Sequence, residues 1–490
     1  MSSSAHFPDP SSFQHQSDQF VAWLEANPGV KVNPKICLAD LRSTGAGRGV
    51  VARTNIPEGE ELFSIPRNLI LAVQNSELKN LLGQDVDALG PWLSLMLVML
   101  YEYLQGDNSR WAAYFRVLPT RFDTLMFWSP AELHELQASA IVDKIGKHGA
   151  DESILQSIVP IVRGNPGLFP PVNGVASYEG DAGAAALLEL AHIMGSLIMA
   201  YAFDIEKSET EEEDDVDEND ESYMTDDEDE QLPKGMVPLA DLLNADADRN
   251  NARLFQEEEC LVMKAIKPIQ EGEEIFNDYG EIPRADLLRR YGYVTDNYSQ
   301  YDVIELPLRD ICLAAGLSNS DVESQPRLTL PQLELLEEND ILDDGYVIPR
   351  PAPNASLQDI LPAELVVLLT TLSLTPEEFE QRRSKNKPPK PSMESNQASF
   401  LYKILQSKQA RYGSSLNDDI QLLTNLLPPN APASLDGSAR RQKMALQVRI
   451  GEKEVLQGVL AMLEPLISGG SLKRSANGDA GTRHSKSARV

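Results

Sequence analysis

Cysteine is scarce in this chain: only Cys37, Cys260 and Cys312 occur among 490 residues. Three cysteines without paired spacing exclude a disulfide framework and argue against a structural zinc site. Long apolar runs are also missing, since no stretch approaches the roughly 18 to 20 uninterrupted apolar residues of a membrane span. The first residues have neither the basic start nor the apolar centre of a signal peptide. We therefore expect a soluble, intracellular protein with no metal and no membrane contact.

Basic residues are also few compared with acidic residues. The chain has 43 Lys and Arg against 75 Asp and Glu, a formal net charge of -32. Sixteen of the acidic residues lie between Glu206 and Glu230, together with one lysine. This segment cannot bury enough apolar surface to fold, so we predict a disordered loop, which either is a solvated spacer or attracts a basic substrate. The overall charge disfavours direct binding of nucleic acid.

The spacing of apolar residues divides the chain into strand-rich and helical stretches. Strand patterns fill Val30 to Leu71 and resume at Met236, and an insertion with mostly helical spacing, about 75–235, separates them. After Leu306 the pattern changes to helices joined by proline-rich loops. The last of these helices is predicted at about 438–467, where apolar residues form one stripe.

These changes of pattern predict an α+β fold in two domains. The first domain is expected over 19–306 and contains the acidic loop 206–230. The second, over 308–467, is expected to be all-α. Residues 1–18 and the basic end, 468–490, are expected to be disordered.

Two distant segments, 48–63 and 261–276, repeat one pattern. Each contains Ile-x-Glu-Gly-Glu-Glu after a strand pattern and before a second short strand. A strand, a turn around Glu-Gly and another strand predict a hairpin in each copy. Taken alone, the two copies could equally be surface hairpins that share only their turn chemistry.

Two further segments place polar residues at the ends of apolar strands. Met-Val-Pro-Leu-Ala-Asp241-Leu-Leu-Asn244 ends in an Asp and an Asn, and Glu-Ile-Phe-Asn-Asp-Tyr279-Gly ends in a single tyrosine. Polar residues that follow a strand often meet a ligand. Together with the repeated segments, these motifs resemble the two signature motifs of the SET-domain protein lysine methyltransferases.

The resemblance extends from about Val30 to Leu306. The helical part that follows is similar to the substrate-binding domain of the Rubisco methyltransferase branch of this family. Within the branch, the chain is most similar to the fungal ribosomal-protein lysine methyltransferases and to their nuclear animal relatives. A SET fold implies small curved β-sheets, split here by the helical insertion, that bring an N-terminal glycine loop and a C-terminal tyrosine into one site.

The resemblance also implies a cofactor, S-adenosylmethionine, and the residues that bind it. The implied cofactor-binding residues are Ala46, Gly47, Arg48, Tyr201, Asn244, Ala245 and Tyr291. Tyr279 is the implied catalytic tyrosine, and Tyr279 and Tyr291 line the channel for the substrate lysine. Ala245 stands where the family has a histidine, so backbone contacts remain there but the side-chain contribution is lost. Without the resemblance, the string Gly45–Gly49 would be an ordinary turn and Tyr201 a core residue.

The chemistry of methyl transfer explains why tyrosines suffice. A lysine has a pKa near 10.4, so making its amine neutral at pH 7 costs about 4 to 5 kcal/mol. Burial beside the sulfonium charge of the cofactor lowers this cost, because desolvation and a like charge both favour the neutral amine. The hydroxyl of Tyr279 can then align the amine with the methyl group. A crowded channel leaves little space for added methyls, so monomethylation is expected.

We therefore expect an S-adenosylmethionine-dependent protein-lysine N-methyltransferase that acts on a basic protein of the large ribosomal subunit. The alternatives are another nuclear non-histone or histone substrate, and an inactive SET scaffold that binds basic proteins. A monomer located in the nucleus is expected, with the cytoplasm as a further location.

Overall fold

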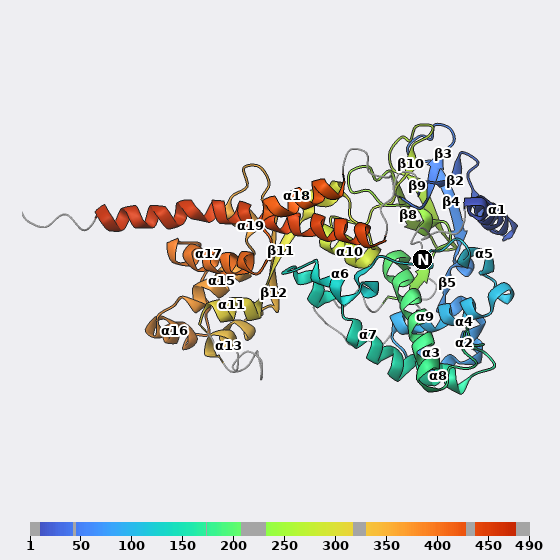
Figure 1. Cartoon of the computed structure of the whole chain (residues 1–490), viewed down its shortest axis with the longest axis horizontal. Coiled ribbons are helices and arrows are strands. Elements are labelled where there is room, and N and C mark those ends of the chain that lie inside the picture. Colours follow the sequence, from blue (N-terminus) through green and yellow to red (C-terminus); the bar gives the residue numbers. More distant parts are fainter. Residues whose placement is uncertain are drawn as a thin grey trace, which may run out of the picture.

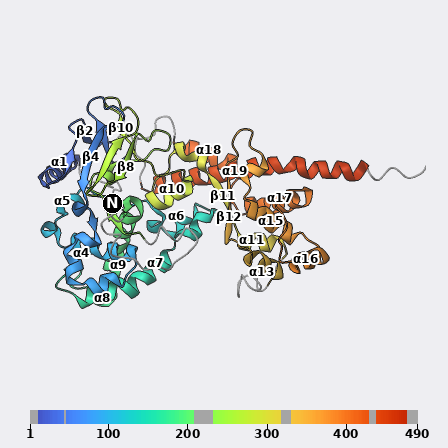
Figure 2. The same cartoon turned by 180° about the vertical axis from the view of Figure 1, so that it is seen from behind.

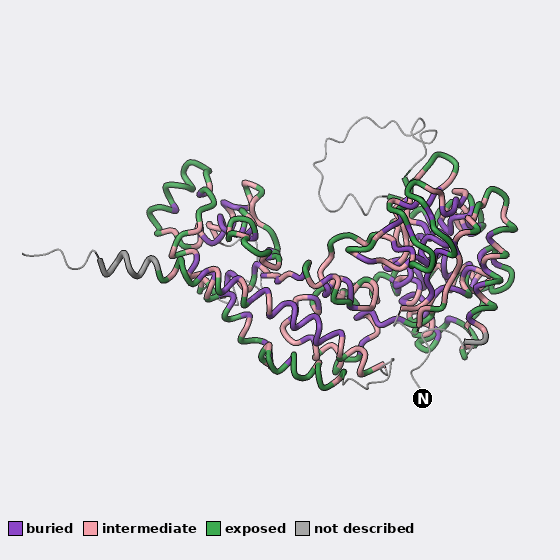
Figure 3. The backbone as a smooth tube through the Cα atoms, turned by 90° about the horizontal axis from the view of Figure 1, so that it is seen from above, coloured by how far each residue is buried: buried purple, intermediate pink, exposed green. Residues whose placement is uncertain are grey.

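The structure, a computed structural model, describes residues 10–42, 46–172, 174–206, 232–316, 330–427 and 437–476. Figure 1 shows a sheet-containing part beside an elongated helical part, and Figure 2 shows the same arrangement from behind. The long helix α19 (Gly437–Ala476) begins next to α10 (Arg284–Tyr291) and continues along the helical part. In Figure 3 the buried residues of the sheet-containing part form a dense centre.

The described residues of the first part form three small antiparallel sheets. Their strand orders are β1-β4-β9-β8, β10-β3-β2 and β5-β7-β6. The strands are β1 (Lys31–Val32), β2 (Ile36–Asp40), β3 (Arg48–Ala52), β4 (Glu61–Pro66), β5 (Leu71–Ala72), β6 (Ala202–Asp204), β7 (Lys234–Met236), β8 (Ala252–Gln256), β9 (Cys260–Ala265) and β10 (Glu274–Ile275). The sheets β1-β4-β9-β8 and β10-β3-β2 combine strands from before and after the helical insertion. The sheet β5-β7-β6 combines a strand from before the insertion with two strands at its end.

The two repeated segments pair with each other. Strand β3 of the first copy pairs with β10 of the second, and β4 pairs with β9. Between them, the amides of Ile56 and Ile269 each donate to the carbonyl of the other at 2.9 Å. Gly59 and Gly272 have φ values of +81° and +83°, which favour glycine at both turns. The predicted hairpin within each copy is wrong, because β3 pairs with β2 and β10, β4 pairs with β1 and β9, and β9 pairs with β4 and β8.

The insertion is helical, as predicted. Its α-helices are α2 (Glu77–Leu81), α3 (Gly83–Asp87), α4 (Pro91–Leu104), α5 (Ala112–Phe115), α6 (Pro130–His134), α7 (Lys147–Ser153), α8 (Val159–Gly164) and α9 (Gly180–Tyr201). By length and composition α9 is apolar enough to cross a membrane. It is a core helix here, because it packs against α4 and α10 and buries Leu187, Met194 and Leu197.

The second part has its own core. Its helices are α11 (Leu308–Ala314), α13 (Pro331–Glu337), α14 (Leu357–Ile360), α15 (Ala363–Leu372), α16 (Pro376–Arg383), α17 (Ser395–Ala410), α18 (Leu416–Leu426) and α19. Strands β11 (Val303–Pro307) and β12 (Gly345–Pro349) pair antiparallel and belong to this core. The sequence prediction did not include β12, whose burial alternates along its five residues. Helix α19 extends nine residues beyond the predicted end at 467.

The N-terminus is ordered further than expected. Helix α1 covers Pro10–Ala26, whereas we expected residues 1–18 to be disordered. Phe13 and Ser17 are buried, because the helix packs against the sheet-containing part. The acidic loop 207–230, the glycine Gly45 and the end of the chain after 476 lie outside the described residues. The other domain boundaries stay predictions.

A third hydrophobic cluster joins the two parts. Met444, Ala445 and Val448 of α19 pack against Ala285 and Leu288 of α10, and Leu125 and Trp128 of the insertion belong to the same cluster. Helix α19 therefore completes a core of the first part, and the first part alone would expose this apolar surface to water.

We predict that Met444→Ala destabilises the protein by about 2 to 3 kcal/mol, because Met444 is 4% exposed and truncation leaves a cavity at the junction. Urea unfolding of the purified protein measures the change. Leu466→Ala is the matched control, because Leu466 lies on the same helix and is 38% exposed. Equal midpoints for the two variants would show that α19 does not complete this core.

Candidate active site

The two motif segments lie side by side. Ala245 forms an isolated parallel bridge with Asn277, and the amide of Asn277 donates to the carbonyl of Asn244 at 2.9 Å. The first segment reaches this place through a short 3-10 helix, Ala240–Leu242, that follows Leu239, whose φ is positive (76°). Tyr279 lies two residues after Asn277 in the second segment, and its hydroxyl donates to the carbonyl of Leu243 at 3.5 Å.

Asn244 holds these segments against strand β3. Its Nδ2 donates to Glu274 Oε1 at 2.7 Å and to the carbonyl of Arg48 at 3.3 Å. Gly49 permits this approach, because a Cβ there would lie 2.8 Å from Glu274 Oε1 and 3.0 Å from Asn244 Nδ2. Burial raises the pKa of Glu274. Asn251 fixes the next strand, accepting from the Phe276 amide at 2.8 Å.

The side chain of Arg48 points away from this site. Its Nε donates to Ser17 Oγ at 3.1 Å, its Nη1 donates to the Val117 carbonyl at 2.6 Å, and its guanidinium carbon lies 4.1 Å from the centre of the Phe13 ring. Burial lowers the pKa of Arg48 to about 10. Arg48 thus anchors α1, and only its backbone can contact a cofactor at Ala46–Arg48.

Four tyrosines surround the end of the second motif. The rings of Tyr279 and Tyr291 stack with centroids 4.2 Å apart and an angle of 10°, and Tyr293 lies 6.4 Å from Tyr291. Tyr201, the last residue of α9, interacts electrostatically with Tyr279 and Tyr291. Burial is the main cause that raises the pKa of all four hydroxyls, so they stay protonated and can donate.

A buried carboxyl completes the cluster. Asp241 accepts a short hydrogen bond from the hydroxyl of Tyr114, and it interacts electrostatically with Tyr201 and Tyr279. Its other oxygen, Oδ1, has no hydrogen-bond partner within the described ranges. Burial raises the pKa of Asp241 to about 8, so the carboxyl is mostly protonated at neutral pH.

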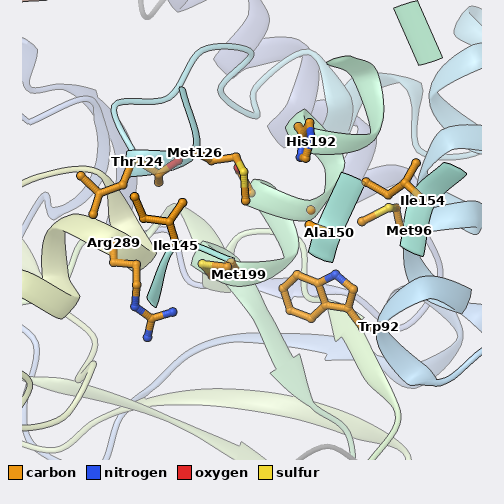
Figure 4. A pocket seen from close by; sticks show the side chains of 13 residues that line it. Trp92, Met96, Thr124, Met126, Ile145, Ala150, Ile154, His192, Met199 and Arg289 are labelled. Carbon is orange, nitrogen blue, oxygen red and sulfur yellow. The ribbon is translucent and has the colours of Figure 1, made fainter. Parts of the chain in front are cut away.

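A cavity lies between α4, α7, α9 and α10. Its volume is about 190 Å³, and its lining is mainly apolar, including Trp92, Met96, Met126 and Met199 (Figure 4). None of the predicted site residues lines it. Among the residues that the structure describes, no group of three His, Cys, Asp or Glu side chains could hold a metal ion.

The cluster fits a cationic group. The groups that act electrostatically on Tyr279 are three tyrosines and Asp241, with no lysine or arginine among them. Aromatic faces attract a cation such as a sulfonium. The backbone at Ala46–Arg48 and Asn244–Ala245, together with Tyr201 and Tyr291, would hold S-adenosylmethionine, which supplies the methyl group as a sulfonium.

Comparison with known proteins agrees with this geometry. Residues 47–280 match the model of the SET domain, and residues 326–456 match that of the Rubisco LSMT substrate-binding domain. The chain is 35% identical over 366 residues to "Ribosomal lysine N-methyltransferase 4" of Saccharomyces cerevisiae, covering 73% of this chain and 67% of the yeast protein. It is 28% identical over 473 residues to "N-lysine methyltransferase setd6" of Xenopus laevis, covering 91% and 94%.

Solved structures show the same fold. The SET domain of LSMT bound to lysine and AdoHcy has a TM-score of 0.63 at 21% identity, covering 96% of this chain and 97% of that chain. A structure of Rubisco LSMT bound to AdoMet also has a TM-score of 0.63, at 20% identity, covering 95% and 97%.

The fold and the tyrosine cluster define a SET-type active site. The chain belongs to the SET-domain family of protein-lysine N-methyltransferases that carry a Rubisco LSMT-type substrate-binding domain. It is an enzyme with S-adenosylmethionine as its cofactor.

The side chains present explain how this site handles a lysine. In the predicted roles, the buried tyrosines would exclude water and lower the pKa of an incoming amine, which favours the neutral, nucleophilic form. The hydroxyl of Tyr279, held at the Leu243 carbonyl, would orient the amine. The stacked ring of Tyr291 would form a wall for the aliphatic stem.

The sequence predicted the positions that meet but not all of their roles. Tyr279, Tyr291, Tyr201 and the Asn244–Ala245 pair come together as expected. The functional roles of these residues stay predictions. Asp241 stood in the first motif, yet no role was assigned to it, because its partner Tyr114 lies 127 residues away in the chain. Tyr293 was also missed; its spacing of two residues after Tyr291 was the available signal.

We predict that Tyr279→Phe keeps cofactor binding within a few-fold and lowers methyl transfer by roughly two orders of magnitude, because an orienting hydroxyl is lost. Calorimetry and incorporation of labelled methyl groups measure the two effects. Tyr103→Phe is the matched control, since this tyrosine is 38% exposed and packs on Phe115 away from the cluster. Near-normal turnover of Tyr279→Phe would remove Tyr279 from this role.

We predict a pH dependence of stability that Asp241→Asn removes. The pKa of Asp241 is about 8 in the folded protein and about 3.9 in an unfolded chain. Between these values the unfolded chain releases the proton and the folded protein keeps it, so the free energy of unfolding falls as pH rises from about 4 to 8.

Denaturant unfolding at pH 5 and pH 8 tests this. The wild type should lose more stability between the two pH values than Asp241→Asn, whose amide does not titrate. Asp143→Asn, at an exposed aspartate, should behave like the wild type. An unchanged pH dependence in Asp241→Asn would show that Asp241 is ionised in the folded protein.

Proposed function

We propose that this enzyme monomethylates a lysine of a protein of the large ribosomal subunit. The observation that carries the proposal is the 35% identity to the yeast protein named "Ribosomal lysine N-methyltransferase 4". Ribosomal proteins are basic, and the formal charge of -32 favours encounter with a basic partner.

The stacked tyrosines support a single methylation. A centroid separation of 4.2 Å between Tyr279 and Tyr291 leaves no space between these rings, so a methylated amine must fit beside them. Crowding at the amine disfavours the reorientation that a second transfer requires.

The alternative substrate is another nuclear protein, histone or non-histone. A non-ribosomal substrate is supported by the match to "N-lysine methyltransferase setd6", a name that specifies no ribosomal target and a match that covers 91% of this chain, more than the 73% of the yeast match. We place the enzyme in the nucleus in both cases, supported by five Lys and Arg residues in the last 22 positions of the chain. Fluorescent tagging of the full chain tests the location. We also propose that the enzyme acts as a monomer.

The test of the substrate is a comparison of protein fractions. The full-length enzyme is incubated with labelled S-adenosylmethionine and, separately, with large-subunit ribosomal proteins, core histones and a nuclear extract depleted of ribosomal proteins. We expect label in one protein of the ribosomal fraction, with a mass increase of one methyl group on one lysine. Tyr279→Phe is the control for enzyme-dependent label. Label only in histones or in the depleted extract would exclude the ribosomal substrate, and no label in any fraction would favour an inactive scaffold.

A further inference from the structure

Helix α10 connects the active site to the long helix α19. Tyr291, which stacks on Tyr279, is the last residue of α10, and Arg284 is its first. Any shift of α10 therefore moves the ring of Tyr291. Figures 1 and 2 show α10 beside the beginning of α19, and the two helices are in contact.

The beginning of α10 is fixed by a buried ion pair. Asp302 accepts from the backbone amide of Arg284 at 3.1 Å and from its Nη2 at 2.6 Å. The two side chains are only 4% and 5% exposed. Arg350 adds a second cation, with its Nη2 3.2 Å from Asp302 Oδ2 and 2.8 Å from Glu454 of α19. The carboxylate also lies at a helix N-terminus, where negative charge is stabilised.

Helix α19 is shaped to receive this ion pair. Gly451 faces it, and a Cβ at this position would lie 2.1 Å from Asp302 Oδ2 and 2.6 Å from Arg284 Nη2. Its backbone conformation does not require glycine, since φ is not positive. Glycine at the middle of a helix costs about 1 kcal/mol relative to alanine. The absence of a side chain is therefore explained by the space that the ion pair occupies.

The end of α10 is held by the same helix through an intermediate segment. Gly292 follows Tyr291 with φ +74°, and a Cβ there would lie 2.8 Å from the backbone nitrogen of Thr124. The neighbouring Asp123 accepts from Nε of Arg440 at 2.5 Å and from Nε of Arg441 at 2.9 Å. Both arginines belong to α19.

We infer that α19 is a positioning element for methyl transfer, which sets the place of Tyr291 by holding both ends of α10. Its positioning residues are Gly451, through the Arg284–Asp302 pair, and Arg440 and Arg441, through Asp123. The helical part therefore acts on the chemistry of the site in addition to any role in docking the substrate. None of these residues touches the reacting atoms, so each acts through Tyr291.

A purely structural role would give a different result in a double-mutant cycle. If the ion pair only stabilises the fold, its disruption and the loss of Tyr291 have independent effects on binding at the site. If it acts through Tyr291, disruption has no further effect once Tyr291 is truncated.

The test is calorimetry of S-adenosylhomocysteine binding to the full chain, which requires no protein substrate and so does not depend on the proposed ribosomal target. Gly451→Ala should weaken binding on the order of fivefold, the size expected for coupled neighbours. The same change in the Tyr291→Ala background should leave binding unchanged. Gly458→Ala is the matched control, because it lies on α19, gains the same helix propensity and meets only the Pro351 ring, at 3.3 Å.

A second variant covers the case in which Gly451→Ala does not fold. Arg441→Gln removes the hydrogen bond to Asp123 and the ion pair with Glu132 from a side chain that is 18% exposed, and it should show the same dependence on Tyr291. Methyl transfer to the ribosomal-protein fraction gives a parallel readout, in which we expect the same coupling in the rate. The inference would be overturned if Gly451→Ala or Arg441→Gln weakened S-adenosylhomocysteine binding equally with Tyr291 present and with Tyr291→Ala. Wild-type affinity in both variants would also overturn it.

Discussion

The antiparallel pairing of two repeated segments is the constraint on which the active site depends. Residues 48–63 and 261–276 exchange hydrogen bonds in both directions, through β3 with β10, β4 with β9, and Ile56 with Ile269. Because 197 residues separate the two copies, this pairing closes a very long loop, which contains the whole helical insertion. It also sets the glycine-rich start of β3 opposite the strand that leads to Tyr279.

Burial governs the electrostatics of the site that this pairing creates. Tyr201, Tyr279, Tyr291 and Asp241 all have raised pKa values, and desolvation is the largest cause in each case. The same desolvation that keeps these groups neutral favours the neutral form of an entering lysine. Desolvation thus favours the neutral form of the side chains and of the substrate amine. This explains why the site lacks a separate strong base among the described residues.

Helix α19 makes the two parts of the molecule energetically dependent on each other. It contributes Met444, Ala445 and Val448 to a shared hydrophobic cluster, and it supplies the arginines that bind Asp123 and Glu135 of the first part. A buried ion pair costs desolvation, so such pairs specify geometry more than they add stability. The apolar cluster is therefore the main source of stability at the junction.

The sequence by itself determined the family-defining motifs, the α+β class and the helical insertion, because strand patterns, turn glycines and helical spacing are local properties of the chain. Tyr279, Tyr291, Tyr201 and Asn244 could be named as one site only through the resemblance of the segments around them to the SET family. Only the tertiary structure decided that the repeated strands pair with each other, that the side chain of Arg48 faces α1, and that Asp241 is buried on Tyr114. It also decided that Gly451 receives the Arg284–Asp302 pair. Each of these depends on contacts between residues that are distant in sequence, and burial, which sets their pKa values and their space, exists only once the chain has packed.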